Sequence, residues 1–273
     1  MEPKRYLGLL AGILLAIPAL AQEDRSYTFG IVPQQPPSEL AKLWTPFLSY
    51  LSEKTGYQLV FATSRGIGPF SERLYDGNYD FSYANPYHYT VAHDRSGYEA
   101  IAKRKNVSLR GILVVRADSS IADVSELDGQ DIGFPSETAF AATLITRAHF
   151  NKNNIPVVPQ YVNSHNAVYR GVINGRFPAG GGVMRTFNNL PEKERNKLKV
   201  FWTSDDYSAH AFMAHPGVPS EVVEKVQQAM VEMANDEVGK RWLKRIRIPA
   251  IEAAGDSEWN DIRELNLGEV LDN

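Results

Sequence analysis

The 273-residue sequence contains no cysteine, and this absence excludes several kinds of chemistry. No disulfide bond can form, no thiol can act as a nucleophile, and no thiolate can bind a metal ion. Stability must therefore come from ordinary hydrophobic cores. About 250 residues are enough for two domains or for one large one.

The common catalytic and nucleotide-binding motifs are also absent. There is no Gly-x-Ser-x-Gly elbow, no His-Glu-x-x-His pair and no Gly-x-x-x-x-Gly-Lys phosphate loop. The pairs His88/His93 and His210/His215 are spaced five apart, which does not place both rings on one helical face. We therefore expect no enzyme, no metal site and no cofactor.

A strong charge of either sign is lacking as well. The formal net charge is −3, and removing residues 1–21, with Lys4, Arg5 and Glu2, takes it from −3 to −4. Nucleic acid and anionic membranes are thus poor candidates as partners. If the ligand is an anion, a local site must capture it.

The N-terminus has the three-part pattern of a secretory signal peptide. Lys4 and Arg5 precede an apolar run from Leu7 to Ile17, which is too short to span a bilayer, and Ala19-Leu20-Ala21 follows. We expect residues 1–21 to be a signal peptide that is cleaved after Ala21. The mature protein should be exported to a bacterial periplasm, without a lipid anchor on cysteine.

Helical and extended patterns alternate along the rest of the chain, which predicts mostly parallel sheets covered on both faces. One long helix is expected to be capped by Ser38 and ended by Gly56. Two such sets of elements favour two α/β lobes. We expect residues 27–116 and 212–273 in lobe 1 and residues 117–211 in lobe 2, with extended crossings near Arg116 and Ala211.

The stretch GFPSETAFAATL, residues 133–144, places Ser136 and Thr138 at a strand-to-helix turn. In open α/β sheets the ligand crevice lies where strands end and helices begin, and free N–H groups at a helix start favour an anion. Helix capping explains the same residues. Glu137 opposes an anion unless its carboxylate points to solvent. His165, at a second such turn, would face the same crevice.

Two further segments carry candidate binding groups. Tyr83 and Asn85 stand in an aromatic stretch at another strand-to-helix junction, and Ser64 and Arg65 follow the second strand. These side chains can donate to the oxygen atoms of an anion, although packing or solvation is an alternative for each. A cation or metal held by a cage of Tyr83, Tyr87, His88 and Tyr89 is a second possibility.

The run Gly180-Gly181-Gly182 falls at a strand position. Glycine weakens strands, so a run of it indicates close approach of another backbone or of a ligand, or else a simple loop.

From about Tyr27 to Ile251 the chain resembles the phosphate/phosphite/phosphonate-type substrate-binding proteins of bacterial ABC transporters, which have the type II periplasmic-binding fold. The resembling segments are YTFGIVPQQPPSELAKLWTPFLSYLSEKTGYQLVF, NYDFSYANPYHY, FPSETAFAATLITRAHF and VNSHNAVYRGVINGRFPAGGGVMRT.

The resemblance implies an oxyanion held between the lobes by Ser136, Thr138 and the Ala139 N–H, with His165 alongside. Tyr83 and the Ser64-Arg65 loop would close on it from the other lobe. Better-characterised phosphonate binders carry an acidic residue in the strand that is AGGGV here, and they lack a residue like Glu137.

The resemblance further implies a monomer that delivers phosphonate, phosphite, phosphate or a similar ion to a membrane ABC permease. The same fold would also serve a sensor that signals to a membrane kinase. An exported hydrolase is a third reading, for which the sequence offers no nucleophile–base motif.

Overall fold

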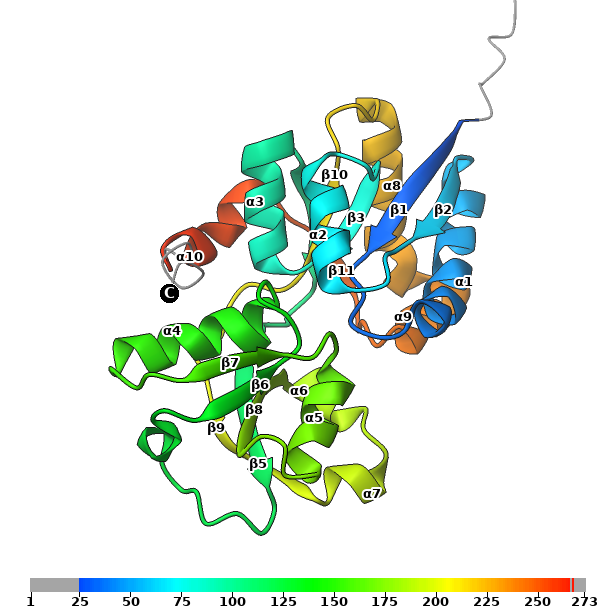
Figure 1. The fold of residues 1–273 in the computed structure, drawn as a ribbon. Helices are drawn as coiled ribbons and strands as arrows, with labels where there is room; N and C mark the ends of the chain where they lie inside the picture. The colour runs from blue at the N-terminus through cyan, green and yellow to red at the C-terminus, as the bar shows by residue number, and fades with distance from the viewer. Residues whose placement is uncertain (1–24, 266, 268–273) are drawn as a thin grey trace, which may run out of the picture.

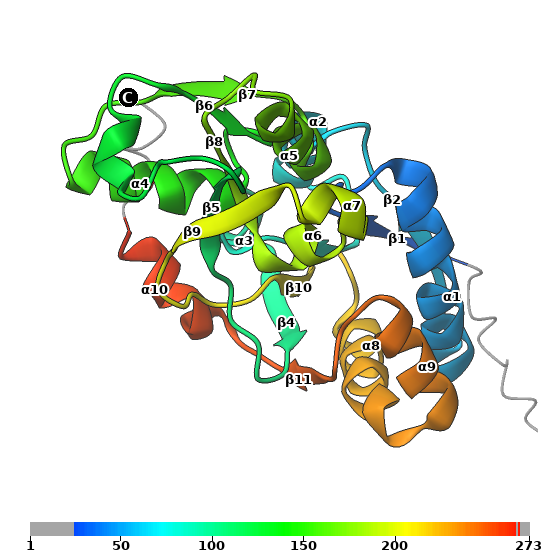
Figure 2. The same cartoon turned by 90° about the horizontal axis from the view of Figure 1, so that it is seen from below.

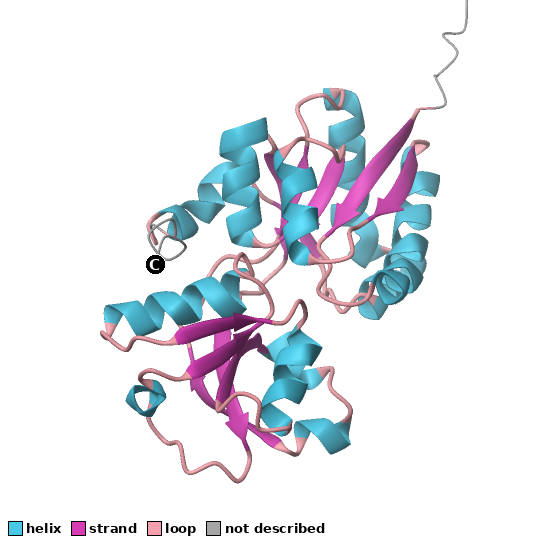
Figure 3. Cartoon of the chain, in the orientation of Figure 1, coloured by secondary structure: helices cyan, strands magenta, loops and turns pink. Residues whose placement is uncertain are grey.

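The computed structural model describes residues 25–265 and 267, so the expected signal peptide lies outside the described residues. The described chain forms two α/β lobes, each built on one sheet with helices on its faces (Figures 1 and 3). No helix in the described part of the chain combines the length and the apolar character needed to cross a membrane.

The first lobe contains a six-stranded sheet in the order β11-β4-β10-β3-β1-β2. Strands β2, β1 and β3 are parallel, whereas β10 is antiparallel to both of its neighbours, β3 and β4. The bounds are β1 Ser26–Ile31, β2 Gln58–Ala62, β3 Phe81–Ala84, β4 Glu99–Arg104, β10 Ala211–Ala214 and β11 Ile251–Ala253.

The second lobe contains a five-stranded sheet in the order β7-β6-β8-β5-β9. Strands β7, β6 and β8 are parallel, and β5 is antiparallel to β8 and β9. The bounds are β5 Gly111–Arg116, β6 Asp131–Phe134, β7 Val158–Tyr161, β8 Ala179–Val183 and β9 Leu198–Thr203.

Helices cover both faces of each sheet. In the first lobe, α1, α8 and α9 pack on one face (Figure 2), and α2 and α3 pack on the other. In the second lobe, α5 and α6 lie opposite α4. The longer helices are α1 Pro37–Thr55, α2 Ile67–Tyr75, α3 Pro86–Ser96, α4 Ile145–Lys152, α5 His165–Ile173, α8 Ser220–Glu232 and α9 Glu237–Arg245; the short ones are η1 Val124–Leu127, η2 Phe140–Leu144, α6 Met184–Asn188, α7 Glu192–Arg195, η3 Met233–Asn235, η4 Asp256–Trp259 and α10 Asn260–Arg263.

The ends of α1 confirm one local expectation and correct another. Gly56 ends the helix in the left-handed conformation, with φ of 75°, as expected. Ser38 is not the N-cap, because the helix begins one residue earlier at Pro37 and no side chain caps it. Proline at the first helical position has its φ angle already fixed near the helical value, so the helix starts there.

Two connectors link the lobes, and strand pairing fixes their positions. The first, residues 105–110, leads from β4 to β5, and the second, residues 204–210, leads from β9 to β10. Arg116 does not mark the crossing, because it pairs with Leu198 at the far end of β5, inside the second sheet. We propose the connectors as the lobe boundaries, in place of a boundary at Arg116.

The connectors are bonded to each other as well as running side by side. Leu109 and Tyr207 exchange backbone hydrogen bonds of 2.7 and 2.9 Å. The Arg110 guanidinium also binds the Asp206 carboxylate through two nitrogens, with Nε at 2.7 Å. We propose that the bonded pair of connectors is the hinge between the lobes.

The lobes are in contact in this conformation. Phe140 and Leu144 of the second lobe are almost fully buried and pack in one apolar cluster with first-lobe residues that include Val32 and Tyr89. The structure therefore describes a closed arrangement of the two lobes.

The three glycines lie within β8 and allow helices to approach its backbone. A Cβ on Gly181 would lie 2.0 Å from the Ala142 carbonyl oxygen, and one on Gly182 would lie 2.3 Å from the Tyr169 hydroxyl. The prediction that another part of the chain or a ligand approaches these glycines closely is confirmed: the backbone of η2 and the Tyr169 side chain of α5 do so.

Candidate functional site

The loop after β6 leads into a helix that starts with a π-helical turn. This turn, η2, continues directly into α4, so the helix runs from Phe140 to Lys152. Ala139 is the N-cap and its side chain makes no capping bond. The first N–H groups of the helix have no intrahelical acceptor, and they carry the positive end of the helix dipole.

Thr138 joins this loop to the first lobe. Its carbonyl accepts a hydrogen bond of 3.0 Å from Asn85 Nδ2, and its hydroxyl lies 3.2 Å from His88 Nε2. Ser71 donates to the Ile67 carbonyl at 2.8 Å, so at its 2.9 Å contact with His88 it accepts. With this arrangement His88 Nε2 carries the hydrogen, and the Thr138 hydroxyl can donate to Ser71 Oγ, 3.5 Å away, or to a ligand.

Ser136 and Glu137 point to different surroundings. Ser136 Oγ is buried and has no hydrogen-bond partner among the described residues, although its carbonyl accepts a 2.7 Å bond from the Thr143 hydroxyl. Glu137 is exposed. The carboxylate therefore faces solvent, which was the condition for an anion site at this turn.

A small cavity lies between the lobes beside the start of this helix. We call it the deep cavity; its volume is about 20 Å³, and its walls include Asn85, Ala139, His165 and His210. This volume holds about one water molecule. Ser136 and Thr138 do not line it and lie beside it in the loop.

His165 is the first residue of α5, where Ser164 caps the helix by accepting from the Ala167 N–H at 3.2 Å. Its ring is buried, and its Nδ1 has no partner in the described part of the chain. Burial lowers the pKa of His165 to about 4, so the ring is neutral near pH 7.

His210, which sequence reasoning did not place in the site, lies in the same wall. Its Nε2 is 3.2 Å from Gln34 Nε2, an amide nitrogen that can only donate. His210 Nδ1 must therefore carry the ring hydrogen, and this donor is buried with no partner among residues 25–265. Burial holds the pKa of His210 well below its usual value.

Tyr83 lies behind His210, at a second cavity. Its ring stacks on the His210 ring with 5.2 Å between centroids, and its hydroxyl is buried without a described hydrogen-bond partner. The cavity that it lines also includes Trp44 and Arg185.

Ser64 and Arg65 are farther from the deep cavity. Ser64 Oγ is 3.3 Å from the Tyr79 hydroxyl, and Arg65 is exposed. Arg65 lines an open groove of about 670 Å³ whose other walls are residues 33–37 and several residues between 163 and 176, along α5 and just beyond its end. It lies at the mouth of the interlobe region.

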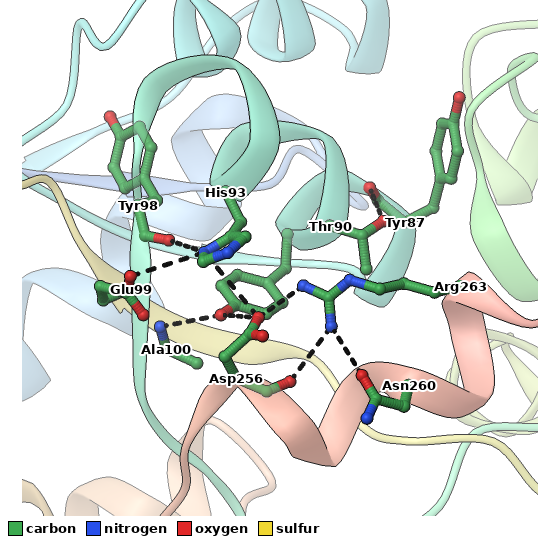
Figure 4. Close-up of polar contacts among 10 residues, drawn as sticks. Tyr87, Thr90, His93, Tyr98, Glu99, Ala100, Asp256, Asn260 and Arg263 are labelled. Atoms are coloured by element: carbon green, nitrogen blue, oxygen red, sulfur yellow. Dashed lines mark hydrogen bonds and ion pairs between the residues drawn. The ribbon is translucent and has the colours of Figure 1, made fainter.

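The structure does not assemble the cage that a cationic ligand would need. The Tyr89 hydroxyl donates to Asp256 at 2.7 Å, in a polar cluster that links α3 to α10 (Figure 4). His88 is bonded to Ser71, and Tyr83 faces His210. No group of three or more metal-binding side chains occurs in the described residues.

Two lobes on mixed α/β sheets, joined by paired connectors with a cavity between them, define the type II periplasmic-binding fold. The family model for the ABC transporter, phosphonate, periplasmic substrate-binding protein matches residues 29–259, and the chain belongs to this family. It is therefore a solute-binding protein, of a family that works with a membrane permease outside the cytoplasm.

Similar proteins agree with this assignment. A phosphate-import protein, PhnD, from Mycolicibacterium smegmatis is 20% identical over 230 residues, covering 76% of this chain and 72% of the relative. A binding protein component of an ABC phosphonate transporter from Pseudomonas aeruginosa has a TM-score of 0.81 and 19% identity, covering 89% of this chain and 86% of that one. PhnD1 from Prochlorococcus marinus in complex with methylphosphonate also has a TM-score of 0.81, with 17% identity and coverage of 90% and 98%.

Proposed function

We propose that the protein captures a phosphonate-type oxyanion at the deep cavity and delivers it, as a monomer and without catalysis, to a membrane ABC permease. The helix start after Ala139, the hydroxyls of Ser136 and Thr138, and the His165 and His210 rings supply the donors. The Ala139 N–H joins them by leaving its long bond of 3.4 Å to the Ser136 carbonyl. Export by a signal peptide at residues 1–21 is part of the proposal. Delivery is preferred to kinase signalling because the matching family is a transporter component.

The observation that carries the proposal is the set of buried polar atoms without partners. Ser136 Oγ, His165 Nδ1 and His210 Nδ1 all lie in or beside the wall of one cavity, and none has a hydrogen bond to the described chain. Leaving a buried polar group unpaired costs about 1–3 kcal/mol each. An oxyanion would accept hydrogen bonds from all three and from the helix start.

The contacts between the lobes explain how the ligand would be retained. Thr138 is held by Asn85 and His88, so the anion loop and the first lobe form part of one closed surface. Because the deep cavity holds about one water, a larger oxyanion enters while the lobes are further apart. A ligand that bonds to both lobes then favours a form in which they close around it, with a cavity larger than the one in this structure.

Isothermal titration calorimetry tests the proposal with methylphosphonate, phosphite, phosphate and sulfate. The double variant S136A/T138A should bind each ligand about tenfold or more weakly, since hydrogen bonds to a charged group contribute about 1.5–3 kcal/mol each. S125A, in η1 of the second lobe, is a matched serine control outside the site. Absence of binding to every anion, or unchanged affinity in the double variant, would contradict the proposal.

A further inference from the structure

A larger cavity adjoins the deep cavity on its first-connector side. It has a volume of about 260 Å³, and we call it the arginine cavity, because Arg104, Arg110 and Arg185 line it. Four residues are walls of both cavities: Gln34, Leu109, Val183 and His210. A ligand group at the deep cavity can therefore extend into the arginine cavity past the His210 ring.

Two of the three arginines lack a negative partner. Arg110 is paired with Asp206, but no carboxylate of the described chain lies within 4.0 Å of Arg104 or Arg185. Arg104 Nε is buried and has no hydrogen bond. The Arg185 guanidinium, which has five N–H donors, donates to the Ile246 carbonyl at 3.1 Å and also interacts with the Tyr83 hydroxyl, which leaves further donors for a ligand.

The two arginines come from opposite lobes. Arg104 ends β4 in the first lobe, and Arg185 lies on α6, directly after β8 in the second lobe. Burial lowers the pKa of Arg185; the nearby Tyr83 hydroxyl opposes this shift, and the charge of Arg104 adds to it. Two cations brought together without an anion oppose closure, so a negative group between them would favour the closed lobes.

The walls of the two cavities also lack any group that would hold a cation. Neither the deep cavity nor the arginine cavity has an aspartate or glutamate among its described wall residues. The strand β8, where the family resemblance implies an acidic residue, has Gly180–Gly182 instead, and side chains at these positions would meet α5, η2 and Phe134. An ammonium group on the ligand would meet arginine, and the adjacent Asp206 carboxylate is already paired with Arg110.

We propose that the arginine cavity binds a second anionic group of the ligand, so that the protein selects phosphonates that carry a carboxylate on a short chain. This inference rests on the proposed function, with the phosphonate at the deep cavity. The carboxylate would lie between Arg104 and Arg185 and accept charge-assisted hydrogen bonds from them, which planar guanidinium groups form in pairs.

Calorimetry on the full mature chain tests this selectivity with phosphonoacetate, 3-phosphonopropionate, methylphosphonate and 2-aminoethylphosphonate. The wild-type protein should bind at least one of the two carboxyphosphonates about tenfold or more tightly than methylphosphonate, and 2-aminoethylphosphonate more weakly than methylphosphonate. In R185Q and R104Q the carboxyphosphonate should lose about tenfold or more in affinity, while methylphosphonate changes by less than about threefold. R116Q, at the far end of β5 and paired with Asp118, is the matched control.

Thermal melting of each variant checks the fold, and R185K provides a second variant that keeps the charge and should retain part of the preference. Equal affinity for methylphosphonate and both carboxyphosphonates, or equal losses for the two ligand classes in R185Q and R104Q, would overturn the inference while leaving anion binding intact. If no phosphonate binds the wild type, the proposed function fails, and this inference fails with it.

Discussion

Replacing Gly181 with alanine is expected to lower the melting temperature by about 10 °C and to weaken anion binding about tenfold or more. The added Cβ would lie 2.0 Å from the Ala142 carbonyl oxygen and 2.6 Å from the Phe134 ring. The first of these neighbours is backbone, which cannot rotate away, so β8 and η2 must separate. Overpacking of this kind costs about 3 kcal/mol, and about 2–4 °C is lost per kcal/mol in a domain of this size.

The loss of affinity follows from the same displacement. Moving η2 moves the Ala139 N–H and the helix start away from His165, so the donors no longer converge. G68A is the matched control, because a Cβ there has no neighbour within 4 Å and alanine favours the helix α2. Scanning calorimetry and ligand titration should show G68A close to wild type. A G181A protein of wild-type stability would refute the proposed packing.

Acid is expected to destabilise the protein steeply between about pH 6 and pH 4.5. Burial lowers the pKa of His88 to about 3 and that of His165 to about 4, and it holds the pKa of His210 well below its usual value. An unfolded histidine has a pKa of about 6.5, so in this range the unfolded chain binds more protons than the folded one. Stability is complete above about pH 6.5 and falls as the pH drops toward the folded values.

The expected slope follows from the number of protons. Each buried histidine contributes up to about 1.4 kcal/mol per pH unit to the free energy of unfolding, so three contribute up to about 4 kcal/mol per unit. Urea unfolding at several pH values measures this slope. H165Q should reduce it by about one third. D206N should change it little, because the pKa of Asp206 is lowered to about 2 and that of an unfolded aspartate is about 3.9, so both forms stay mostly ionised above pH 4.5. A flat profile down to pH 4.5 would show that these rings are accessible to protons.

Local sequence signals predicted the alternation of strands and helices but not the sheet to which each strand belongs. The apolar run at Gly111–Arg116 indicates a buried strand, and the boundary expected from the sequence places it in the first lobe. Its partners are β8 and β9 of the second sheet. Apolar periodicity reports burial and carries no information on which distant strand completes the ladder.

The candidate site was predictable where one segment contains both the turn and the donors. The stretch from Ser136 to Ala139 shows a strand end, hydroxyls and a helix start within a few residues. His210 and Gln34 are 176 positions apart, and their contact exists only after the lobes assemble. No sequence pattern near His210 therefore indicates that its ring hydrogen is on Nδ1, where it is available to a ligand. Arg104 and Arg185 likewise come to line one cavity only when the two lobes assemble.

The mutual bonding of the two connectors limits the way in which the molecule can open. Leu109 and Tyr207 form one bonded pair, and the Trp259 indole N–H holds the second connector by donating to the Ala209 carbonyl at 2.9 Å. Two independent connectors would allow the lobes to slide and twist relative to each other. Connectors that are bonded together restrict the motion to rotation about one hinge axis. The edges of the lobes opposite this hinge would move farthest. A permease that contacts both edges would therefore detect a bound ligand as a change in the distance between them.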